Sequence, residues 1–420
     1  MLKKYKQLFI HIALFLLTLI TTTLSGADWI GLQNVKGWDI ILSGLKYSIP
    51  FLGILTIHEF GHYFFAKRNN VETTLPYYIP FYFPGMPSIG TFGAFIRMKG
   101  LAFSRKAIFD IGVAGPLAGF IAALLLLTIG FATLPEKEYI YSIHPDYQKF
   151  DGNYEDHVYK YGYLKAQSDS IVNANYAKDS LDYILNSKSE TSLKKPEKVY
   201  QTEFTEVAVG KNILFWLFEK IFSYQGDKIP NSFELFHYPL LFAAYLALFF
   251  TALNLMPIGQ LDGGHVIYGL FGVNGHRKVS SVAFVCFVFV AGLGMFKDNI
   301  SGINFFTANG SDQLEFGLLY IGFLYILFAR MYNQFLNALL TAVAIFTGQF
   351  LIEFLFPAVV GFNGWLLYAF LIGRFLGVFH PPAIDERPLD NKRKVIGWIS
   401  LLIFILCFTP EVLTFETITK

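Results

Sequence analysis

The residues best suited to chemistry form one short run, His58-Glu59-Phe60-Gly61-His62, near the end of a long apolar segment. On an α-helix, side chains four positions apart lie on one face, so both imidazoles can bind the same metal ion. Glu59 then lies beside the ion without binding it. Zinc hydrolases use the metal to lower the pKa of water and a neighbouring carboxylate to remove the proton, which makes Glu59 the candidate general base.

The same spacing also arises by chance on the solvated face of a helix. Here the run lies inside an apolar stretch near residues 39–66, which is long enough to cross a bilayer. A charged side chain at the centre of a membrane helix costs about 2.5–3.5 kcal/mol. A metal site therefore explains three ionisable side chains at this place better than chance does.

A third protein ligand is needed, because two histidines leave a tetrahedral catalytic zinc one ligand short. The best candidate is Asp262, which follows an apolar run that ends near Met256, and the main competitor is His265. A count of the membrane crossings places Asp262 on the same side of the bilayer as the basic residues that closely follow His62. We therefore expect the two segments to lie at the same depth.

The composition indicates which solvent surrounds these segments. The 420 residues are 54% hydrophobic, 18% aromatic and only 15% charged, which favours a bilayer over water. The predicted fold is an all-α polytopic membrane protein with about nine transmembrane helices, whose ends are uncertain by about 2–4 residues. The apolar runs that predict them lie near residues 8–25, 39–66, 107–134, 238–256, 279–296, 316–332, 335–357, 360–379 and 395–410.

Lysine and arginine are distributed unevenly between the connecting segments. They precede the first run and are frequent in residues 67–106 and 380–394, so these segments and the N-terminus are predicted to be cytoplasmic. The polar stretch of residues 135–236 contains no arginine and is predicted to face the opposite side. The first run is expected to be retained as a helix, rather than removed as a signal peptide, because it approaches bilayer length and further runs follow it.

This pattern of apolar and polar segments divides the chain into three parts. Residues 1–134 are predicted to form an N-terminal membrane segment with the histidine helix and a cytoplasmic β-loop. Residues 135–236 form an extracytoplasmic insertion of unassigned fold, and residues 237–420 form a C-terminal membrane segment with the third zinc ligand. No internal repeat is evident, which argues against a secondary transporter built from two related halves.

Taken together, the two motifs resemble the site-2 protease family of intramembrane zinc metalloproteases. The residues that carry the resemblance are His58-Glu-Phe-Gly-His62 and Asn254-x-x-Pro257-x-x-x-x-Asp262-Gly263. The likeness covers about residues 52–264 without the insertion. It implies Zn²⁺ as the cofactor and Asp262 as its third ligand, and it implies that Asn254 and Pro257 shape the site and hold the substrate.

A glycine-containing segment after the first motif, residues 88–97, is rich in β-branched and aromatic residues and is predicted to be a short strand or hairpin. The resemblance implies a membrane-dipping β-loop here. An exposed edge of it can pair with an unwound substrate by strand addition, which makes Gly90 and Gly93 candidate substrate-binding residues. The alternative is an ordinary cytoplasmic loop.

Other polar or small residues in apolar runs have simpler explanations. The small residues of 114–119 allow the third predicted helix to approach the histidine helix closely. Gln349 and Glu353 either line a polar path or hydrogen-bond between helices. His237 lies at the outer end of the fourth run, far from the predicted depth of the zinc, and His276 is expected in a basic flank on the cytoplasmic side.

These observations predict hydrolysis of a membrane-spanning or membrane-tethered protein by an integral membrane protein of the bacterial cell (inner) membrane. One alternative is a membrane metal transporter or sensor that uses the same side chains without hydrolysis. Another is a different membrane zinc peptidase whose third ligand is a downstream glutamate. The predicted partners are a membrane protein substrate and the lipid bilayer, and the lack of a basic cluster with interleaved aromatic residues argues against nucleic acid. The substrate and the oligomeric state do not follow from the sequence.

Overall fold

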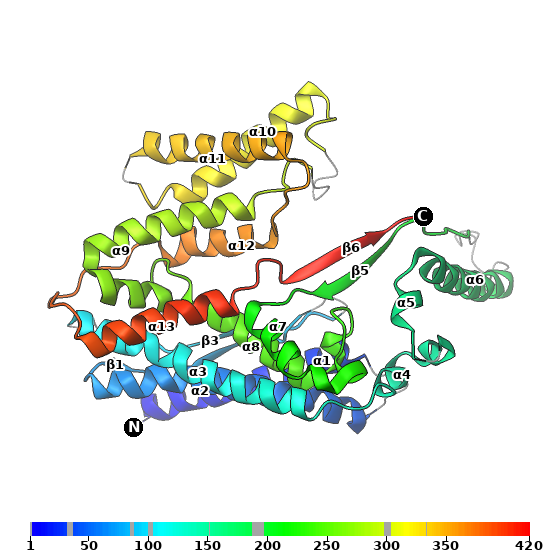
Figure 1. Ribbon diagram of the computed structural model, residues 1–420, viewed down its shortest axis with the longest axis horizontal. Coiled ribbons are helices and arrows are strands. Elements are labelled where there is room, and N and C mark those ends of the chain that lie inside the picture. The colour runs from blue at the N-terminus through cyan, green and yellow to red at the C-terminus, as the bar shows by residue number, and fades with distance from the viewer. Residues whose placement is uncertain are drawn as a thin grey trace.

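A computed structural model describes residues 2–31, 37–84, 88–99, 104–150, 152–186, 197–297, 304–332 and 334–420. The protein is mostly helical (Figure 1). The helices of the membrane part are α1 (Leu2–Ile30), α2 (Trp38–Arg68), α3 (Arg105–Ala132), α8 (Pro239–Leu255), α9 (Asp262–Ala291), α10 (Gly310–Phe328), α11 (Phe335–Leu355), α12 (Gly364–Leu371), the π-helix η5 (Ile372–Leu376) and α13 (Asn391–Cys407).

Each predicted apolar run overlaps one of these helices, although several runs extend beyond the helix ends. Among the described residues, five helices are long and apolar enough to cross a membrane, namely α1, α2, α3, α10 and α11. Helix α8 and the continuous α12–η5 segment are apolar but shorter. Helix α9 contains a kink at Gly272, whose φ of 70° is accessible to glycine at little cost. The prediction of a helical membrane protein is therefore confirmed at this level.

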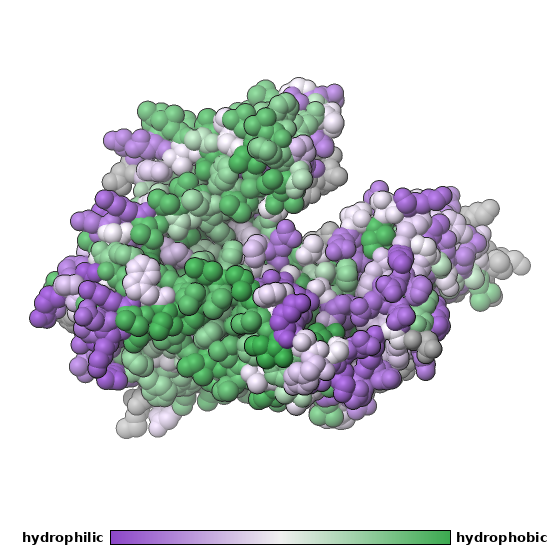
Figure 2. Space-filling model, in the orientation of Figure 1, coloured by the Kyte–Doolittle hydropathy of each residue, from purple (hydrophilic) through white to green (hydrophobic). Residues whose placement is uncertain are grey.

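The membrane helices form two packed groups. Helices α2, α3 and α8 share one core with buried residues such as Phe51, Leu127 and Leu248. A second core lies among α9, α10, α11 and α12 and includes Phe284 and Leu324. Figure 2 shows an apolar surface over the middle of the molecule, with hydrophilic side chains gathered at both ends of its long axis. This band is the pattern expected of a protein surrounded by lipid.

Strands are present as well as helices. The described residues contain three two-stranded antiparallel sheets: β1 (Glu72–Thr73) with β4 (Met98–Lys99), β2 (Tyr77–Pro80) with β3 (Thr91–Phe95), and β5 (Phe204–Val209) with β6 (Leu413–Ile418). Strand β3 lies within residues 88–97, where a strand or hairpin was predicted, and its partner β2 lies before that segment. Backbone hydrogen bonds in the β5–β6 pair join the insertion to the segment that follows α13.

The insertion is folded over much of its length. It contains α4 (Tyr139–Ile143), η1 (Pro145–Phe150), α5 (Glu155–Val158), α6 (Tyr161–Asn186), α7 (Ile213–Ile221), η2 (Ser223–Lys228) and η3 (Leu235–His237), and residues 187–196 lie outside the described part. Helix α7 belongs to the membrane core, because Phe215 packs on Phe131 of α3 at a ring distance of 5.4 Å. Within the insertion, α7 is therefore an apolar helix that packs on the membrane helices, and the polar residues of η2 follow it.

The two segments predicted to be cytoplasmic meet at one end of the molecule. The backbone N–H of Arg105 donates to the carbonyl of Asp385, and the Arg393 guanidinium pairs with the Asp110 carboxylate at 2.7 and 2.9 Å. In Figure 1 this end is on the left, where α2 ends and β1 begins, and the helices α4–α6 of the insertion are on the right.

Candidate metal centre

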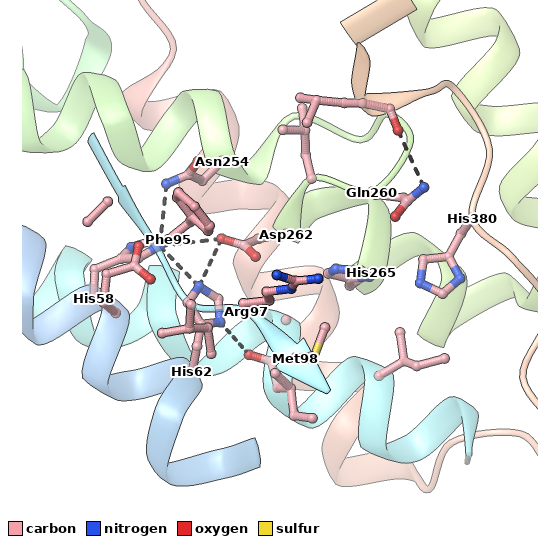
Figure 3. Close-up of a pocket in the computed structure, with 18 of the residues that line it drawn as sticks. His58, His62, Phe95, Arg97, Met98, Asn254, Gln260, Asp262, His265 and His380 are labelled. Atoms are coloured by element: carbon pink, nitrogen blue, oxygen red, sulfur yellow. Dashed lines mark hydrogen bonds and ion pairs between the residues drawn. The ribbon is translucent and has the colours of Figure 1, made fainter. Parts of the chain in front are cut away.

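Three donor atoms from distant parts of the chain converge at the end of α2. His58 Nε2 and His62 Nε2 are 3.1 Å apart, and Asp262 Oδ2 lies 3.4 Å from the first and 3.2 Å from the second (Figure 3). The two histidine side chains are buried, with exposed fractions of 7% and 9%. The structure thus brings together the two segments that the sequence placed at the same depth.

Helix α3 approaches the histidines so closely that it needs glycine. A Cβ at position 115 would lie 2.1 Å from His62 Nε2, and a Cβ on Gly61 would lie 2.6 Å from the carbonyl oxygen of Ala114. A Cβ at position 119 would be 3.2 Å from the Cβ of His58. The prediction that the small residues of 114–119 allow close helix packing is confirmed.

The short loop between α8 and α9 directs Asp262 toward the histidines. Asp262 is the first residue of α9, and the two glycines after it let the first turn lie against the loop backbone. A Cβ on Gly263 would be 1.9 Å from the carbonyl oxygen of Leu255, and a Cβ on Gly264 would be 2.1 Å from that of Gly259. The glycine pair is therefore a packing requirement of this turn.

Two residues that the sequence did not single out for this role hold the same loop. Ser280 Oγ accepts the backbone N–H of Gly259 at 2.8 Å and donates to the carbonyl of Val378 at 2.6 Å. His276 Nε2 lies 3.0 Å from the carbonyl oxygen of Gly259. His276 is fully buried, and its place in a cytoplasmic basic flank with Arg277 and Lys278 stays a prediction. The helix pattern gave no signal for these contacts, because they depend on the kink in α9.

His62 is oriented by a backbone group on the far side of its ring. Its Nδ1 lies 2.8 Å from the carbonyl oxygen of Ile111 in α3 and donates a hydrogen bond to it. The neutral ring then carries its lone pair on Nε2, which faces Asp262. Such a hydrogen bond from the outer nitrogen is typical of histidines that bind metals.

The competing ligand, His265, lies elsewhere in the cavity. Its ring contacts that of His380 at 4.9 Å, on the side away from His58 (Figure 3). Among the described residues, the group that could hold a metal ion at this place consists of His58, His62 and Asp262. The geometry thus favours Asp262 over His265 as the third donor.

A cavity of about 610 Å³ opens beside the three donors. Glu59, which is 4% exposed, lines it next to the histidines. Residues 94–98, at the end of β3 and just after it, form one wall, and His380 with the two prolines that follow it forms another. The His380 segment was not predicted to contribute, because nothing in the local sequence shows that it returns to this site.

The four candidate substrate-binding residues differ in their positions. Asn254 lines the cavity, and its Nδ2 lies 3.4 Å from His58 Nε2. Pro257 lies in the loop after α8, and it is not among the residues that line the cavity. Gly90 has a φ of 87° and packs against α1, where its carbonyl accepts a hydrogen bond from Thr21 at 2.7 Å. Gly93, with a φ of 105°, lies in β3 with open space where a Cβ would be.

Gln349 and Glu353 are structural in the described protein. Glu353 accepts the backbone N–H groups of Gly294 and Phe296 just after α9, at 2.7 and 3.3 Å. Gln349 accepts from the hydroxyl of Tyr320 at 2.8 Å and donates to carbonyls of α9. These contacts agree with hydrogen bonding between helices, which was the simpler explanation of the two residues.

The donor set and its spacing fit zinc. Two imidazole nitrogens and one carboxylate oxygen form a known ligand set of catalytic zinc sites. With bonds of about 2.0–2.1 Å, the donor atoms of a tetrahedral zinc lie about 3.3 Å apart. The three donor–donor distances, 3.1, 3.2 and 3.4 Å, lie on both sides of this value.

The fold and the site together describe a helical membrane protein with a buried site of the metallopeptidase type. A family model, Peptidase family M50, matches residues 46–295, which is more than half of the chain. The chain therefore belongs to peptidase family M50, the site-2 protease family.

Curated relatives are named zinc metalloproteases. The chain is 22% identical over 252 residues to the probable zinc metalloprotease EGY2, chloroplastic, of Oryza sativa subsp. indica, a match that covers 60% of the chain and 34% of the relative. It is 25% identical over 237 residues to the probable zinc metalloprotease EGY1, chloroplastic, of Arabidopsis thaliana, covering 56% of the chain and 31% of the relative. The chain thus spans about a third of the length of the curated relatives it matches. No solved structure matches the chain significantly.

Proposed function

We propose that this chain is an intramembrane zinc metalloprotease that hydrolyses peptide bonds of membrane-spanning or membrane-tethered proteins. The observation that carries the proposal is the convergence of His58, His62 and Asp262, with donor atoms 3.1–3.4 Å apart, beside a cavity that Glu59 also lines. Membership of a peptidase family supports hydrolysis, and it favours this function over a metal transporter or sensor.

In this proposal His58, His62 and Asp262 hold the zinc ion. A bound zinc ion supplies Lewis-acid activation of water and of the scissile carbonyl. Glu59 accepts the proton of the attacking water and later gives it to the leaving amine, so that water and the peptide become a carboxylic acid and an amine. Asn254 donates from its amide at the edge of the site and orients the substrate near His58.

The substrate is expected to bind in an extended form, because a hydrogen-bonded helix hides its carbonyl groups. Strand β3 has β2 as its one partner among the described residues, so its other edge has backbone groups available for strand addition. Gly90 and Gly93 contribute to substrate binding because their positive φ angles shape the backbone of β3. Pro257 contributes because it lies in the turn that leads to Asp262. The β2–β3 pair then acts as the membrane-dipping loop.

The proposed arrangement in the membrane follows the sequence predictions of helix number, orientation and chain parts. About nine helices cross the bilayer, and the N-terminus and the catalytic end face the cytoplasm of a bacterial cell. The parts are residues 1–134, the extracytoplasmic insertion of residues 135–236, and residues 237–420. The end-to-end separation of hydrophilic side chains in Figure 2 supports a crossing along the long axis of the molecule.

The test compares Glu59→Gln with the wild type and with Glu72→Gln, an exposed glutamate in β1 that serves as the matched control. Each protein is expressed in cells that lack the enzyme, and membrane protein fragments are identified by mass spectrometry. Cleavage is expected to fall about 10²–10⁴-fold in Glu59→Gln, with zinc content unchanged, because general base catalysis contributes about this factor. Identical fragments from Glu59→Gln and wild-type cells would exclude proteolysis by this site.

A further inference from the structure

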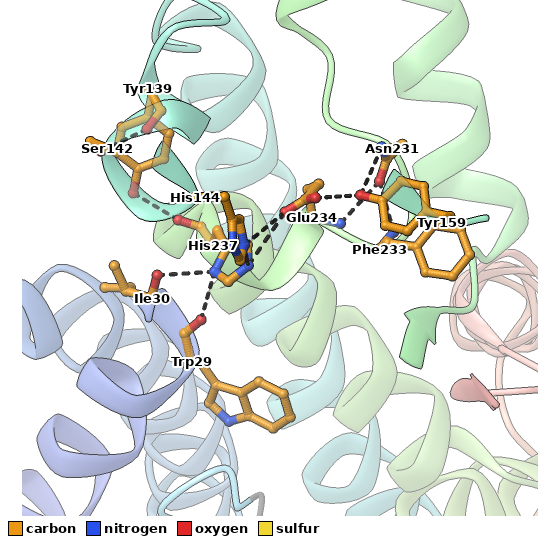
Figure 4. Close-up of polar contacts among 10 residues, drawn as sticks. All are labelled: Trp29, Ile30, Tyr139, Ser142, His144, Tyr159, Asn231, Phe233, Glu234 and His237. Carbon is orange, nitrogen blue, oxygen red and sulfur yellow. Dashed lines mark hydrogen bonds and ion pairs between the residues drawn. The ribbon is translucent and has the colours of Figure 1, made fainter. Parts of the chain in front are cut away.

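A second cluster of metal-binding side chain types lies at the opposite end of the bundle. His144 follows α4, Glu234 immediately precedes η3, and His237 ends η3, just before α8 (Figure 4). Asp262 follows the other end of α8, a helix of 17 residues, so about 25 Å of helix separates the cluster from the first site. The two groups are therefore independent.

The three side chains point their donor atoms toward one another. His144 Nε2 and His237 Nε2 are 3.2 Å apart. Glu234 Oε2 lies 3.7 Å from the former and 3.4 Å from the latter. These distances are close to the about 3.3 Å expected between ligands of a tetrahedral zinc. They also resemble those of the first site, where the two imidazole nitrogens are 3.1 Å apart.

His237 is held in the tautomer that a metal ligand requires. Its Nδ1 lies 2.9 Å from the carbonyl oxygen of Ile30 and 3.1 Å from that of Trp29, at the end of α1. Carbonyl oxygens only accept hydrogen bonds, so Nδ1 carries the proton and the lone pair of the neutral ring is on Nε2. This is the same orientation that the Ile111 carbonyl gives to His62.

Glu234 contributes an oxygen that is buried and lacks a hydrogen-bond donor. Its side chain is 3% exposed. Oε1 accepts the hydroxyl of Tyr159, whereas Oε2, which faces the histidines, has no hydrogen-bond partner in the described protein. A buried carboxylate oxygen without a donor is costly, and a cation coordinated by it would remove this cost.

An ion can reach the cluster from water. The His144 side chain is 30% exposed, whereas those of Glu234 and His237 are 3% and 9% exposed. Three protein ligands, of which one lies near the surface, leave the fourth position of a tetrahedral ion for water. Imidazole and carboxylate donors in this number suit zinc better than calcium or magnesium, which prefer oxygen ligands.

We infer that His144, Glu234 and His237 form a second zinc site, which fastens the insertion to the membrane helices. His144 belongs to the insertion, Glu234 and His237 lead into α8, and His237 is hydrogen-bonded to the end of α1. Zinc binding at this place would add to the hydrogen bonds that already join these segments, such as those from the Tyr139 hydroxyl to the carbonyl of His237 and from the Tyr159 hydroxyl to Glu234. The inference does not depend on the proposed proteolytic activity.

The alternative is a cluster held by hydrogen bonds without metal, in which His144 Nε2–H donates to His237 Nε2. Zinc stoichiometry distinguishes the two. The full-length protein in detergent is stripped of metal with a chelator, reloaded with Zn²⁺ alone, separated from free ions and analysed by elemental mass spectrometry. The wild type is expected to retain two zinc ions per chain, His144→Ala one, Asp262→Ala one, and the double variant none.

The matched control is His157→Ala, which removes an exposed histidine of the insertion that stacks on Phe150 at 4.7 Å. It is expected to retain two zinc ions. The inference is overturned if the wild type binds one zinc ion that Asp262→Ala removes, or if His144→Ala binds as much zinc as the wild type.

A second measurement uses a variant of the first site, in which the second cluster keeps its wild-type residues. The result therefore does not depend on whether variants of the insertion fold. The His58→Ala/His62→Ala variant is stripped and titrated with Co²⁺, whose visible absorption reports a four-coordinate site. One equivalent of Co²⁺ with this spectrum is expected, and adding Zn²⁺ should displace it. A titration that yields no such spectrum contradicts the inference.

Discussion

Gly115 of α3 faces His62 of α2 so closely that a Cβ at position 115 would lie 2.1 Å from the Nε2 atom of the imidazole. Gly115→Ala is therefore expected to displace the ring from Asp262 and to reduce zinc binding. Overpacking of this kind also destabilises a protein by about 1–3 kcal/mol. Zinc content and the midpoint of thermal unfolding measure the two effects.

The control for this variant is Gly53→Ala in α2, where no atom lies within 4 Å of the added Cβ. This change should leave zinc content unchanged and stabilise the helix by up to about 1 kcal/mol, because alanine has the higher helix propensity. Equal zinc contents in Gly115→Ala and Gly53→Ala would show that the close approach has no part in metal binding.

Removal of the carboxylate of Asp262 tests the assignment of the third ligand. Loss of a residue that only hydrogen-bonds to a metal ligand typically weakens metal binding about 10–100-fold. Asp262→Asn removes a ligand itself, so it is expected to weaken zinc binding at the first site by more than this factor. His265→Ala should retain zinc at this site, because its ring lies against His380 instead. Competition with a chromophoric chelator measures both affinities. The assignment is wrong if His265→Ala loses the ion and Asp262→Asn keeps it.

Ser280 is expected to stabilise the loop that precedes Asp262. In Ser280→Ala the buried N–H of Gly259 and the carbonyl of Val378 lose their partner, which should cost about 1–3 kcal/mol of unfolding free energy. The neighbouring Ser281→Ala is the control, since Ser281 is partly exposed. Chemical denaturation in detergent measures the difference. Equal stabilities of the two variants would mean that water replaces the hydroxyl of Ser280.

The β5–β6 pair should become less stable as the pH rises. Burial raises the pKa of Glu206 above its usual value of 4.5, and Glu206 lies directly opposite Glu416 in the strand register. The folded form holds the proton more tightly than the unfolded form, so the favourable contribution is complete below pH 4.5 and is lost as the pH rises through the folded pKa. Like charges opposite each other add a repulsion of about 0.2–1 kcal/mol.

Glu206→Gln keeps the neutral form at every pH. It should therefore raise the unfolding temperature at about pH 8 and have little effect near pH 4.5, where the wild-type side chain also becomes protonated. Glu203→Gln, which is exposed and lies just before β5, is the control. An increase of the same size at both pH values would exclude ionisation of Glu206 as the cause.

Local sequence patterns were sufficient to predict the helices and the convergence of His58, His62 and Asp262. The i, i+4 spacing of His58 and His62 places both rings on one helix face, and the count of membrane crossings brought Asp262 to the same end. The kink at Gly272 and the partner strand of β3 were missed. Both depend on contacts between segments that the periodicity of the sequence does not show.

The second cluster shows the same limit. His237 was correctly expected to lie far from the first site, but His144, 93 residues before it, gave no spacing signal. Glu234 and His237 are three positions apart, a spacing that also occurs in metal-binding helices. On its own such a pair is too common to predict a site, and His144 comes next to the pair only in the folded protein.

The hydroxyl of Ser280 has a mechanical consequence for the cavity. It joins the backbone of Gly259, three residues before Asp262, to that of Val378, two residues before His380. The segments that carry Asp262 and His380 border the same opening, so an outward shift of one pulls on the other. In the proposed protease, admission of a bulky polypeptide through this aperture would therefore be coupled to the placement of the Asp262 carboxylate.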